Sequence, residues 1–149
     1  PGCPGRHGGL TRFANRKHLA RAVLESTAYQ TRDVADAMVA DSGVEITELR
    51  VDGGMTMNEL LMQFQSDILG VEVHRPKNIE TTATGAAFAA GLDNGFWEDL
   101  SVLGSQEGDM KVFKPKREKE EVEALYRDWK RAIKRSLDWE DNEDEDLNI

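Results

Sequence analysis

Residues 48–70 run ELRVDGGMTMNELLMQFQSDILG, and this stretch decides the fold class. The short apolar run from Leu49 to Val51 predicts a β-strand over 48–51, and apolar residues at three- and four-residue steps predict a helix over 58–69. Gly53 and Gly54 stand between the two. Adjacent glycines cost conformational entropy. The pair therefore marks either a tight turn or a place where the backbone approaches a ligand closely.

The rest of the chain continues the alternation of strands and helices. Asn15 and Gly43 suit the two ends of a first helix, because asparagine caps N-termini and glycine caps C-termini. A loop that contains Gly104 and Gly108 is expected before the last helix. The predicted order is helix, strand, helix, strand, helix, helix, which is typical of the α/β class. The further predicted elements are a strand at 71–76, an Ala-rich helix at 80–91 and an amphipathic helix at 117–137.

Apolar residues at helical spacing mark one face of each long helix. They are Leu19, Val23, Val34 and Met38 in the first helix, Leu60, Leu61, Phe64 and Ile68 in the second, and Val122, Leu125, Trp129, Ile133 and Leu137 in the last. The small side chains of the helix at 80–91 predict that it packs closely against another element.

The composition indicates a soluble globular protein of about one domain, since 39% of the 149 residues are hydrophobic and 32% are charged. Acidic residues between Glu140 and Asp146 account for most of the formal charge of −9 and predict a disordered acidic tail over 140–149. The rest of the chain has no basic face that would indicate a nucleic-acid partner.

Cysteine content and the start of the chain bear on its compartment. Cys3 is the single cysteine, so no internal disulfide is possible and a cytoplasmic location is expected. The small apolar stretch at 86–90 is far shorter than the ~20 residues of a membrane span, and no signal peptide is visible. Residues 1–8 are expected to be a disordered leader or a cloning remnant, and a start at Pro1 suggests an internal fragment or a processed start.

The common nucleotide-binding and catalytic motifs are absent from the sequence. It contains no GxxxxGK[ST] motif and no GxGxxG motif after a strand. His7, His18 and His74 lack the spacing of metal ligands, and no nucleophile–base arrangement can be identified. Two other places could receive a ligand.

The first place is the turn at Gly53 and Gly54, together with Asn58. The glycines let a ligand lie against the main chain, and the following helix N-terminus supplies N–H groups and a positive dipole end. Ligands in open α/β sheets bind beyond the carboxyl ends of the strands, where this turn falls. An ordinary turn with Asn58 as the helix N-cap is the alternative, and spacing by itself favours that alternative.

The second place is the segment 81–85, where Thr81, Thr82 and Thr84 could receive phosphate oxygens at a helix start, although a capping turn with a packing glycine at Gly85 is favoured. Two acids are also of interest. Asp52 ends a strand, a common catalytic location, whereas Asp67 is expected to be solvated. Three tryptophans are expected to serve packing and not to form a binding platform: Trp97, Trp129 and Trp139.

Several motifs together carry a family resemblance. They are LESTAYQTRDVADAM (24–38), LRVDGG (49–54), LMQFQSDILGVEVHRP (61–76), ETTATGAAFAAGL (80–92) and NGFW (94–97). With them the chain resembles the glycerol kinases, which belong to the FGGY carbohydrate kinases within the actin/Hsp70-like ATPase superfamily. The resemblance implies a partial actin-like (ribonuclease H-like) ATPase domain, a mixed sheet flanked by helices. Residues 9–139 would be the C-terminal part of the kinase's second domain.

The resemblance also implies which residues meet a ligand. It places the adenosine end and the α-phosphate of ATP at Gly54 and Asn58, with Gly53 as their neighbour. A branched side chain at Gly54 is expected to fill ligand space and to resist a positive φ there. The sequence departs from the family pattern at three positions beside this site: Met55, Met57 and Glu59.

By the same resemblance, the catalytic aspartate, the glycerol site and the Mg²⁺ site lie in a part of the polypeptide that precedes this chain. The chain would therefore hold no catalytic residue and no metal site, and Asp52 would only shape the turn. The parent enzyme, a possible homo-oligomer, would convert ATP and glycerol to ADP and glycerol 3-phosphate. The isolated chain would be inactive.

Two alternatives stay open. The amphipathic last helix and the acidic tail suggest a non-catalytic interaction module, and a related FGGY sugar kinase could carry similar motifs. A chaperone ATPase of the same superfamily is disfavoured by the segments FWEDL (96–100) and WKRAIKRSLDW (129–139).

Overall fold

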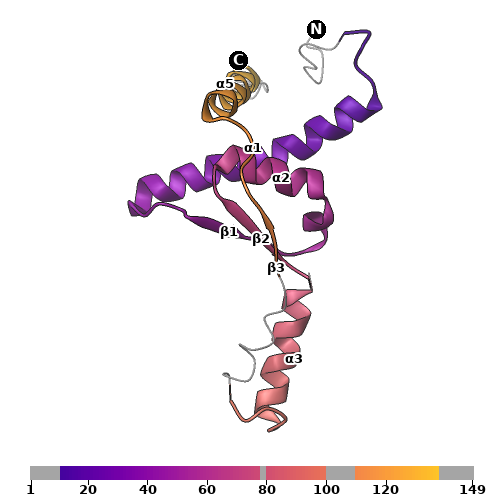
Figure 1. The fold of residues 1–149 in the computed structure, drawn as a ribbon, viewed down its shortest axis with the longest axis vertical. Coiled ribbons are helices and arrows are strands. Elements are labelled where there is room, and N and C mark those ends of the chain that lie inside the picture. Colours follow the sequence, from indigo (N-terminus) through magenta and orange to yellow (C-terminus); the bar gives the residue numbers. More distant parts are fainter. Residues whose placement is uncertain (1–10, 78–79, 100–109, 138–149) are drawn as a thin grey trace, which may run out of the picture.

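The computed structural model describes residues 11–77, 80–99 and 110–137, drawn as a ribbon in Figure 1. The predicted leader at 1–8 and the predicted acidic tail at 140–149 lie outside the described residues. In chain order the elements are α1 (Arg16–Ser42), β1 (Glu48–Arg50), the 3₁₀ helix η1 (Gly54–Met57), α2 (Glu59–Leu69), β2 (Glu72–Pro76), α3 (Thr81–Asp93), β3 (Met110–Phe113) and α5 (Lys119–Ser136).

The predicted caps of the first helix, and the predicted C-terminal end of the second, are confirmed. The Asn15 side chain accepts hydrogen bonds from the backbone N–H groups of Lys17 and His18 at the start of α1. Gly43 and Gly70 follow α1 and α2 with left-handed φ values of 70° and 71°. Glycine adopts this conformation at little cost, so both helices end where the sequence predicts.

The three strands form one mixed sheet in the order β1-β2-β3. β1 and β2 are parallel, whereas β2 and β3 are antiparallel. β3 corrects the prediction of a loop between the Ala-rich helix and the last helix; Gly104 and Gly108 of that loop lie outside the described residues. A strand of four residues carries little local pattern, and pairing with β2 rather than intrinsic preference forms it.

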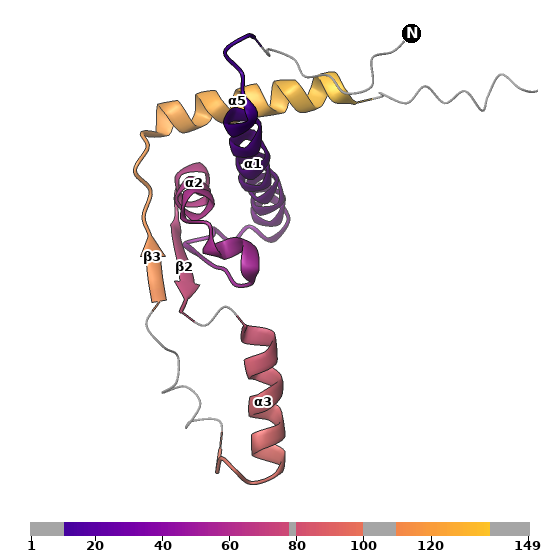
Figure 2. The same ribbon diagram turned by 90° about the vertical axis from the view of Figure 1, so that its right-hand side faces the viewer.

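Helices cover one face of the sheet in two layers. Figure 2 shows α2 against the sheet, α1 beyond α2, and α5 crossing at the end of both. Leu49, Val73 and Phe113 lie side by side on the three strands and pack into the core beneath α2. The alternate residues Glu72 and His74 point to the other face, where their side chains pair. This alternation of apolar and polar residues is typical of a sheet that is covered on one side.

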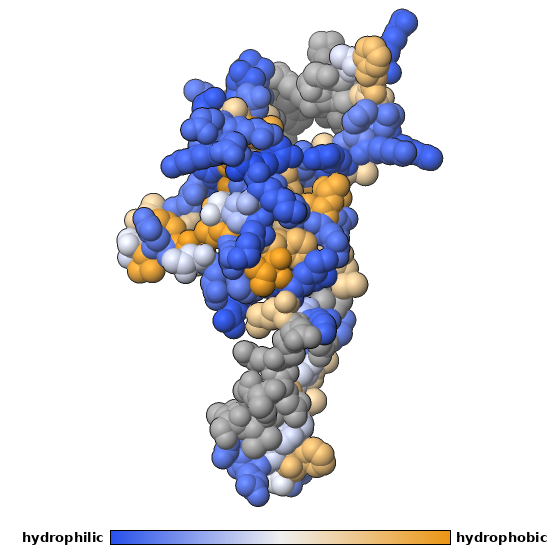
Figure 3. Space-filling model, viewed as in Figure 1, coloured by the Kyte–Doolittle hydropathy of each residue, from blue (hydrophilic) through white to orange (hydrophobic). Residues whose placement is uncertain are grey.

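α1 corrects the prediction of its buried face. Leu19, Val23, Val34 and Met38 are all exposed, whereas Ala28 and Tyr29 are buried. At about 100° per residue these two sets fall on opposite sides of the helix, and the side that meets α2 is the one with Ala28. Apolar residues also interrupt the hydrophilic surface on the face of the molecule that Figure 3 shows.

α2 supplies more residues to the core than any other element described. Leu61, Phe64 and Ile68 are buried as predicted, but Leu60 is 44% exposed. The prediction that Asp67 is solvated is wrong, because Asp67 is only 6% exposed.

The Asp67 carboxylate faces the segment that follows β3. It accepts hydrogen bonds from the Gln63 side chain and from the backbone N–H of Lys116, and Arg117 Nε lies 3.4 Å from it. A buried carboxylate is stable when it is paired and hydrogen-bonded in this way. Asp67 therefore joins α2 to the chain that leads into α5.

α3 extends away from the sheet in both ribbon views (Figures 1 and 2). None of its residues is buried in the part of the chain that the structure describes, so the predicted close packing of this helix finds no partner there. Its C-terminal end contacts the segment that follows it, where the Trp97 ring meets those of Phe88 and Phe96 edge to face. The packing role predicted for Trp97 is confirmed.

α5 packs across α1 through part of its predicted stripe. Within that stripe Val122 is buried and Leu125 and Trp129 pack against the core, whereas Ile133 and Leu137 are exposed. Tyr126, which is not part of the predicted stripe, is buried as well. The Trp129 ring stacks on Tyr29 of α1 with centroids 5.2 Å apart, which confirms a packing role for that tryptophan as well. Trp139 lies outside the described residues.

A polar cluster around Asp33 fastens α5 to α1. The Asp33 carboxylate accepts hydrogen bonds from the Tyr126 hydroxyl (2.5 Å) and the Trp129 indole (2.8 Å), and Lys130 Nζ lies 2.7 Å away. Burial by itself raises the pKa of Asp33, but the hydrogen bonds from Lys130, Tyr126 and Trp129 outweigh it and hold this pKa below its usual range. Burial, with the bonds to Asp33 and Asp36, raises the pKa of Tyr126.

The Asp33 cluster predicts acid sensitivity. Because the pKa of Asp33 is lower in the folded chain than in the unfolded chain, its stabilising contribution is complete above about pH 4 and is lost as the pH falls through the folded-state pKa. We expect Asp33→Asn to lower the free energy of unfolding by roughly 1–3 kcal/mol at pH 7, and by clearly less at pH 3. Urea unfolding at the two pH values measures the difference.

Asp128→Asn is the matched control for this prediction. Asp128 lies on the surface of α5, where it is 69% exposed and pairs with Arg131 of the same helix. The substitution is expected to change the free energy of unfolding by less than about 0.5 kcal/mol. A loss in Asp33→Asn that is equal at both pH values would contradict the role assigned to the Asp33 charge.

Candidate functional site

The glycine turn begins at the carboxyl end of β1. Gly53 has φ 87° and ψ 166°, a backbone conformation that side chains strongly disfavour. Gly54 starts the 3₁₀ helix η1 and has no left-handed φ. The expectation of a positive φ at Gly54 is therefore wrong: the glycine that the turn itself requires is Gly53.

Gly54 is exposed, and its surroundings are open. A Cβ atom placed on Gly54 would meet nothing within 4 Å among the described residues. Neither backbone strain nor crowding in this part of the chain accounts for a glycine at this position. The open space beside Gly54 is consistent with a backbone surface that a ligand approaches.

Asn58 caps α2, as one of the two predicted roles requires. Its Oδ1 accepts a hydrogen bond from the backbone N–H of Leu61 at 3.0 Å. Since an amide side chain carries both an acceptor and two donors, Nδ2 can donate to a ligand while Oδ1 caps the helix. Asn58 is exposed, so capping and ligand binding are compatible.

The residues between Gly54 and Asn58 alternate between surface and interior. Met55 and Met57 are each 59% exposed, whereas Thr56 is 6% exposed. The Thr56 hydroxyl donates to the carbonyl of Gly53 at 2.7 Å, and its backbone N–H donates to the same oxygen at 3.1 Å. The buried Thr56 thus stabilises the turn through its two hydrogen bonds to Gly53, and the side chains of Met55 and Met57 lie on the surface.

The structure brings together the two places that the sequence singles out. The Thr81 hydroxyl, at the start of α3, donates a hydrogen bond to the carboxylate of Asp52, which lies just beyond β1. Thr84 Oγ1 donates to the Glu80 carbonyl at 2.9 Å, which is the local bonding of an ordinary helix start. The predicted packing role of Gly85 has no support here, because a Cβ atom on Gly85 would meet nothing within 4 Å among the described residues.

Arg75 is a site residue that sequence reasoning misses. It lies near the end of β2, and its guanidinium donates to the Thr56 carbonyl within the turn. The alternation of VEVHRP predicts which side of the strand Arg75 occupies. It gives no sign that the side chain reaches back to a turn nineteen residues earlier.

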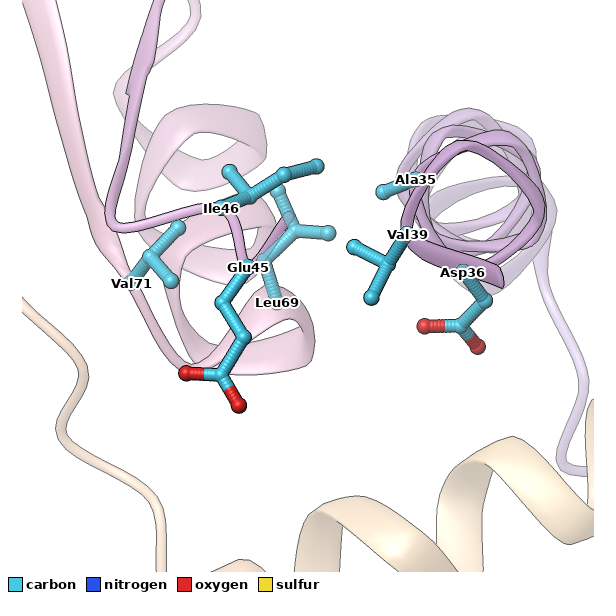
Figure 4. Close-up of a pocket in the computed structure, with 7 residues that line it drawn as sticks. All are labelled: Ala35, Asp36, Val39, Glu45, Ile46, Leu69 and Val71. Carbon is cyan, nitrogen blue, oxygen red and sulfur yellow. The ribbon is translucent and has the colours of Figure 1, made fainter. Parts of the chain in front are cut away.

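A cavity of about 220 Å³ lies elsewhere, between α1, α2 and the segment before β1 (Figure 4). Val39, Leu69 and Val71 form part of its apolar wall, with the carboxylates of Asp36 and Glu45 at its edge. These residues lie near the start of β1 and the end of α2, and hence at the opposite end of both elements from the glycine turn. The cavity and the turn are therefore separate features.

Among the residues that the structure describes, no group of three or more His, Cys, Asp or Glu side chains is placed to hold a metal ion. His74 pairs with Glu72, and His18 accepts a hydrogen bond from the backbone of Asn15; His7 lies outside the described residues. None of the described helices is long and apolar enough to span a membrane.

Comparison with known proteins decides the family. The model of the C-terminal domain of the FGGY family of carbohydrate kinases matches residues 1–93. The chain belongs to the FGGY family of carbohydrate kinases. A glycerol kinase of Corynebacterium kroppenstedtii is 63% identical to it over 145 residues, which cover 97% of this chain and 28% of the relative. This FGGY chain thus spans little more than a quarter of the length of such curated relatives.

Solved structures of FGGY kinases share the fold. A Plasmodium falciparum glycerol kinase, crystallised with ADP, matches with a TM-score of 0.74 and 35% identity, over 87% of this chain and 26% of that one. A xylulose kinase from Rhodospirillum rubrum matches over the same shares with a TM-score of 0.66 and 27% identity. The predicted fold class is confirmed: the mixed sheet and its helices are part of an actin-like ATPase domain.

Proposed function

We propose that this chain is the C-terminal part of an ATP-dependent glycerol kinase. The observation that carries the proposal is the 63% identity to a glycerol kinase over 97% of the chain. The parent enzyme transfers the γ-phosphoryl group of ATP to a hydroxyl of glycerol, giving ADP and glycerol 3-phosphate. Its place of action is the cytoplasm, in keeping with the single cysteine, Cys3, and it can act as a homo-oligomer.

Within that enzyme, the glycine turn contributes the adenosine side of the ATP site. Gly54 leaves room for the nucleotide against the main chain, and Asn58 donates from Nδ2 while its Oδ1 caps α2. Gly53 gives the turn its direction through its positive φ. The N-terminus of α2 adds a positive dipole end beside the α-phosphate. Met55 and Met57, both on the surface of the turn, supply apolar area for the adenine ring.

The chemistry of transfer belongs to the rest of the polypeptide. Phosphoryl transfer depends on positioning and on electrostatic stabilisation, with a divalent cation that neutralises the phosphate oxygens and an acidic residue that receives the acceptor proton. We assign the Mg²⁺ site, the glycerol site and the base to the part that this chain lacks. Asp52 shapes the turn, since its carboxylate already accepts the Thr81 hydroxyl.

The first test compares the parent enzyme with the isolated chain. The parent is expected to phosphorylate glycerol with ATP, whereas the chain has no turnover and binds ATP only at roughly millimolar concentration, as expected if it keeps about −4 kcal/mol of a micromolar site. A coupled assay for ADP measures turnover, and a calorimetric titration measures the affinity for ATP. A parent that accepts xylulose or gluconate and not glycerol would favour the related sugar-kinase hypothesis. Turnover by the isolated chain would overturn the proposal.

The alternative of an interaction module loses part of its motivation in the structure. The apolar face of α5 that suggested a docking helix is partly occupied, because Val122 and Tyr126 pack into the core of this chain. The glycerol kinase proposal requires no such partner.

A further inference from the structure

We propose that Arg75 is a positioning residue for the nucleotide. It fixes the position and orientation of the turn at residues 53–57, so that Gly54 in the turn and Asn58 directly after it can contact ATP. The inference rests on the nucleotide role proposed above for this turn. It adds a residue that touches no ligand and acts through the backbone of the turn.

The link between Arg75 and the turn is direct and shielded. Arg75 Nη1 donates to the Thr56 carbonyl at 2.7 Å. The Arg75 side chain is 12% exposed and Thr56 is 6% exposed, so water has little access to this bond. A hydrogen bond from a charged donor is about twice as strong as a neutral one. It therefore ties the middle of the turn to β2.

The guanidinium is itself held in place. Its Nη2 lies 3.9 Å from Glu59 Oε1, and its carbon lies 5.5 Å from the centre of the Phe113 ring. Lys111, beside Phe113 on β3, also pairs with Glu59. Arg75 is thus fixed by strand β2, by the first residue of α2 and by an aromatic side chain of β3.

The position of Thr56 makes this contact consequential. Thr56 stands midway between Gly54 and Asn58, and its hydroxyl and N–H both bond to the Gly53 carbonyl. A displacement of Thr56 therefore shifts the backbone at Gly54 and the side chain of Asn58 together. The planar fork of arginine can reach Thr56 and Glu59 at once, whereas lysine offers one point charge.

The test uses the full parent enzyme with three variants. Arg75→Gln removes the charge and the fork, and Arg75→Lys keeps the charge. Arg50→Gln is the matched control, since Arg50 lies on the neighbouring strand with its side chain 61% exposed and paired with Glu48. We measure KM for ATP and for glycerol, kcat, thermal stability, and displacement of a fluorescent ATP analogue.

Arg75→Gln is expected to raise KM for ATP and to weaken analogue binding by about tenfold, the effect of losing one charge-assisted hydrogen bond. The KM for glycerol and the kcat at saturating ATP should stay within about twofold, since the tie acts on ATP binding. Arg75→Lys should recover part of the ATP affinity, and Arg50→Gln should change none of these values.

An unchanged ATP affinity in Arg75→Gln would overturn the inference, and so would an equal loss for both substrates in both Arg75 variants together with a lower Tm. If Arg75→Gln fails to fold, the inference is tested with Arg75→Lys, by comparing its KM for ATP, its KM for glycerol and its Tm with those of the unmodified enzyme. Failure of the unmodified parent to phosphorylate glycerol would instead overturn the proposed function. The analogue displacement, which needs no acceptor, still measures the effect of Arg75 in that case.

Discussion

Replacing Gly54 with valine in the parent enzyme is expected to raise the KM for ATP by at least about tenfold, which corresponds to a loss of about 1.4 kcal/mol of binding, while the KM for glycerol stays unchanged. The branched side chain would occupy the space that the adenosine needs. The fold should tolerate it, because the added Cβ meets nothing within 4 Å among the described residues and the backbone of Gly54 is not left-handed. Steady-state kinetics with each substrate varied in turn, together with a thermal melt, measure the result.

Gly53→Val is the matched comparison for Gly54→Val. Gly53 has φ 87°, so any side chain there strains the backbone by roughly 1–3 kcal/mol, and the melt should show a loss of stability that Gly54→Val does not show. Two results would refute the nucleotide role of Gly54. One is unfolding of Gly54→Val, and the other is an equal loss of affinity for ATP and glycerol.

The second large effect is expected in the core, at two adjacent leucines. Leu61 is 2% exposed and packs among Phe64, Ile68 and Val73, whereas Leu60 is 44% exposed. Leu61→Ala should lower the free energy of unfolding by about 2–5 kcal/mol, since it removes buried methyl groups and leaves a cavity. Leu60→Ala should cost less than about 1 kcal/mol. Urea unfolding of both variants checks the pair, and equal losses would show that α2 presents a different face to the sheet.

Local chemistry explains what the sequence predicts well. Asn15, Gly43 and Gly70 set helix ends through side-chain bonding and left-handed backbone, and these interactions involve neighbours in the chain. The glycine turn is visible for the same reason. The positive φ at Gly53 and the open space beside Gly54 depend on the folded backbone and its packing, which residue type alone does not determine.

The predictions from sequence are wrong where contacts between distant segments of the chain determine the structure. β3 becomes a strand through its pairing with β2, and its own four residues carry little signal. Asp67 is buried because Lys116 and Arg117, far along the chain, supply its partners. The two apolar sides of α1 look alike in sequence, and only the packing of α2 shows which side this chain covers.

The site itself was partly within reach of the sequence. Gly53, Gly54 and Asn58 could be named from their spacing and the family resemblance, and their role in nucleotide binding stays a prediction. Arg75 could not be named, since its contact with Thr56 joins a strand to an earlier turn. The Asp52–Thr81 bond likewise joins two candidate segments that the sequence leaves apart.

The contact between α1 and α5 has an optical consequence. The Trp129 indole stacks on Tyr29 and donates its N–H to Asp33, so its surroundings belong to both helices at once. The wavelength of its fluorescence maximum and the quenching of its fluorescence would therefore change when α5 separates from α1. Trp97 contacts Phe88 and Phe96 near the end of α3 and reports on a different region. The protein thus carries intrinsic fluorophores on two parts of its structure, and a single-tryptophan variant of each would let the two be followed independently.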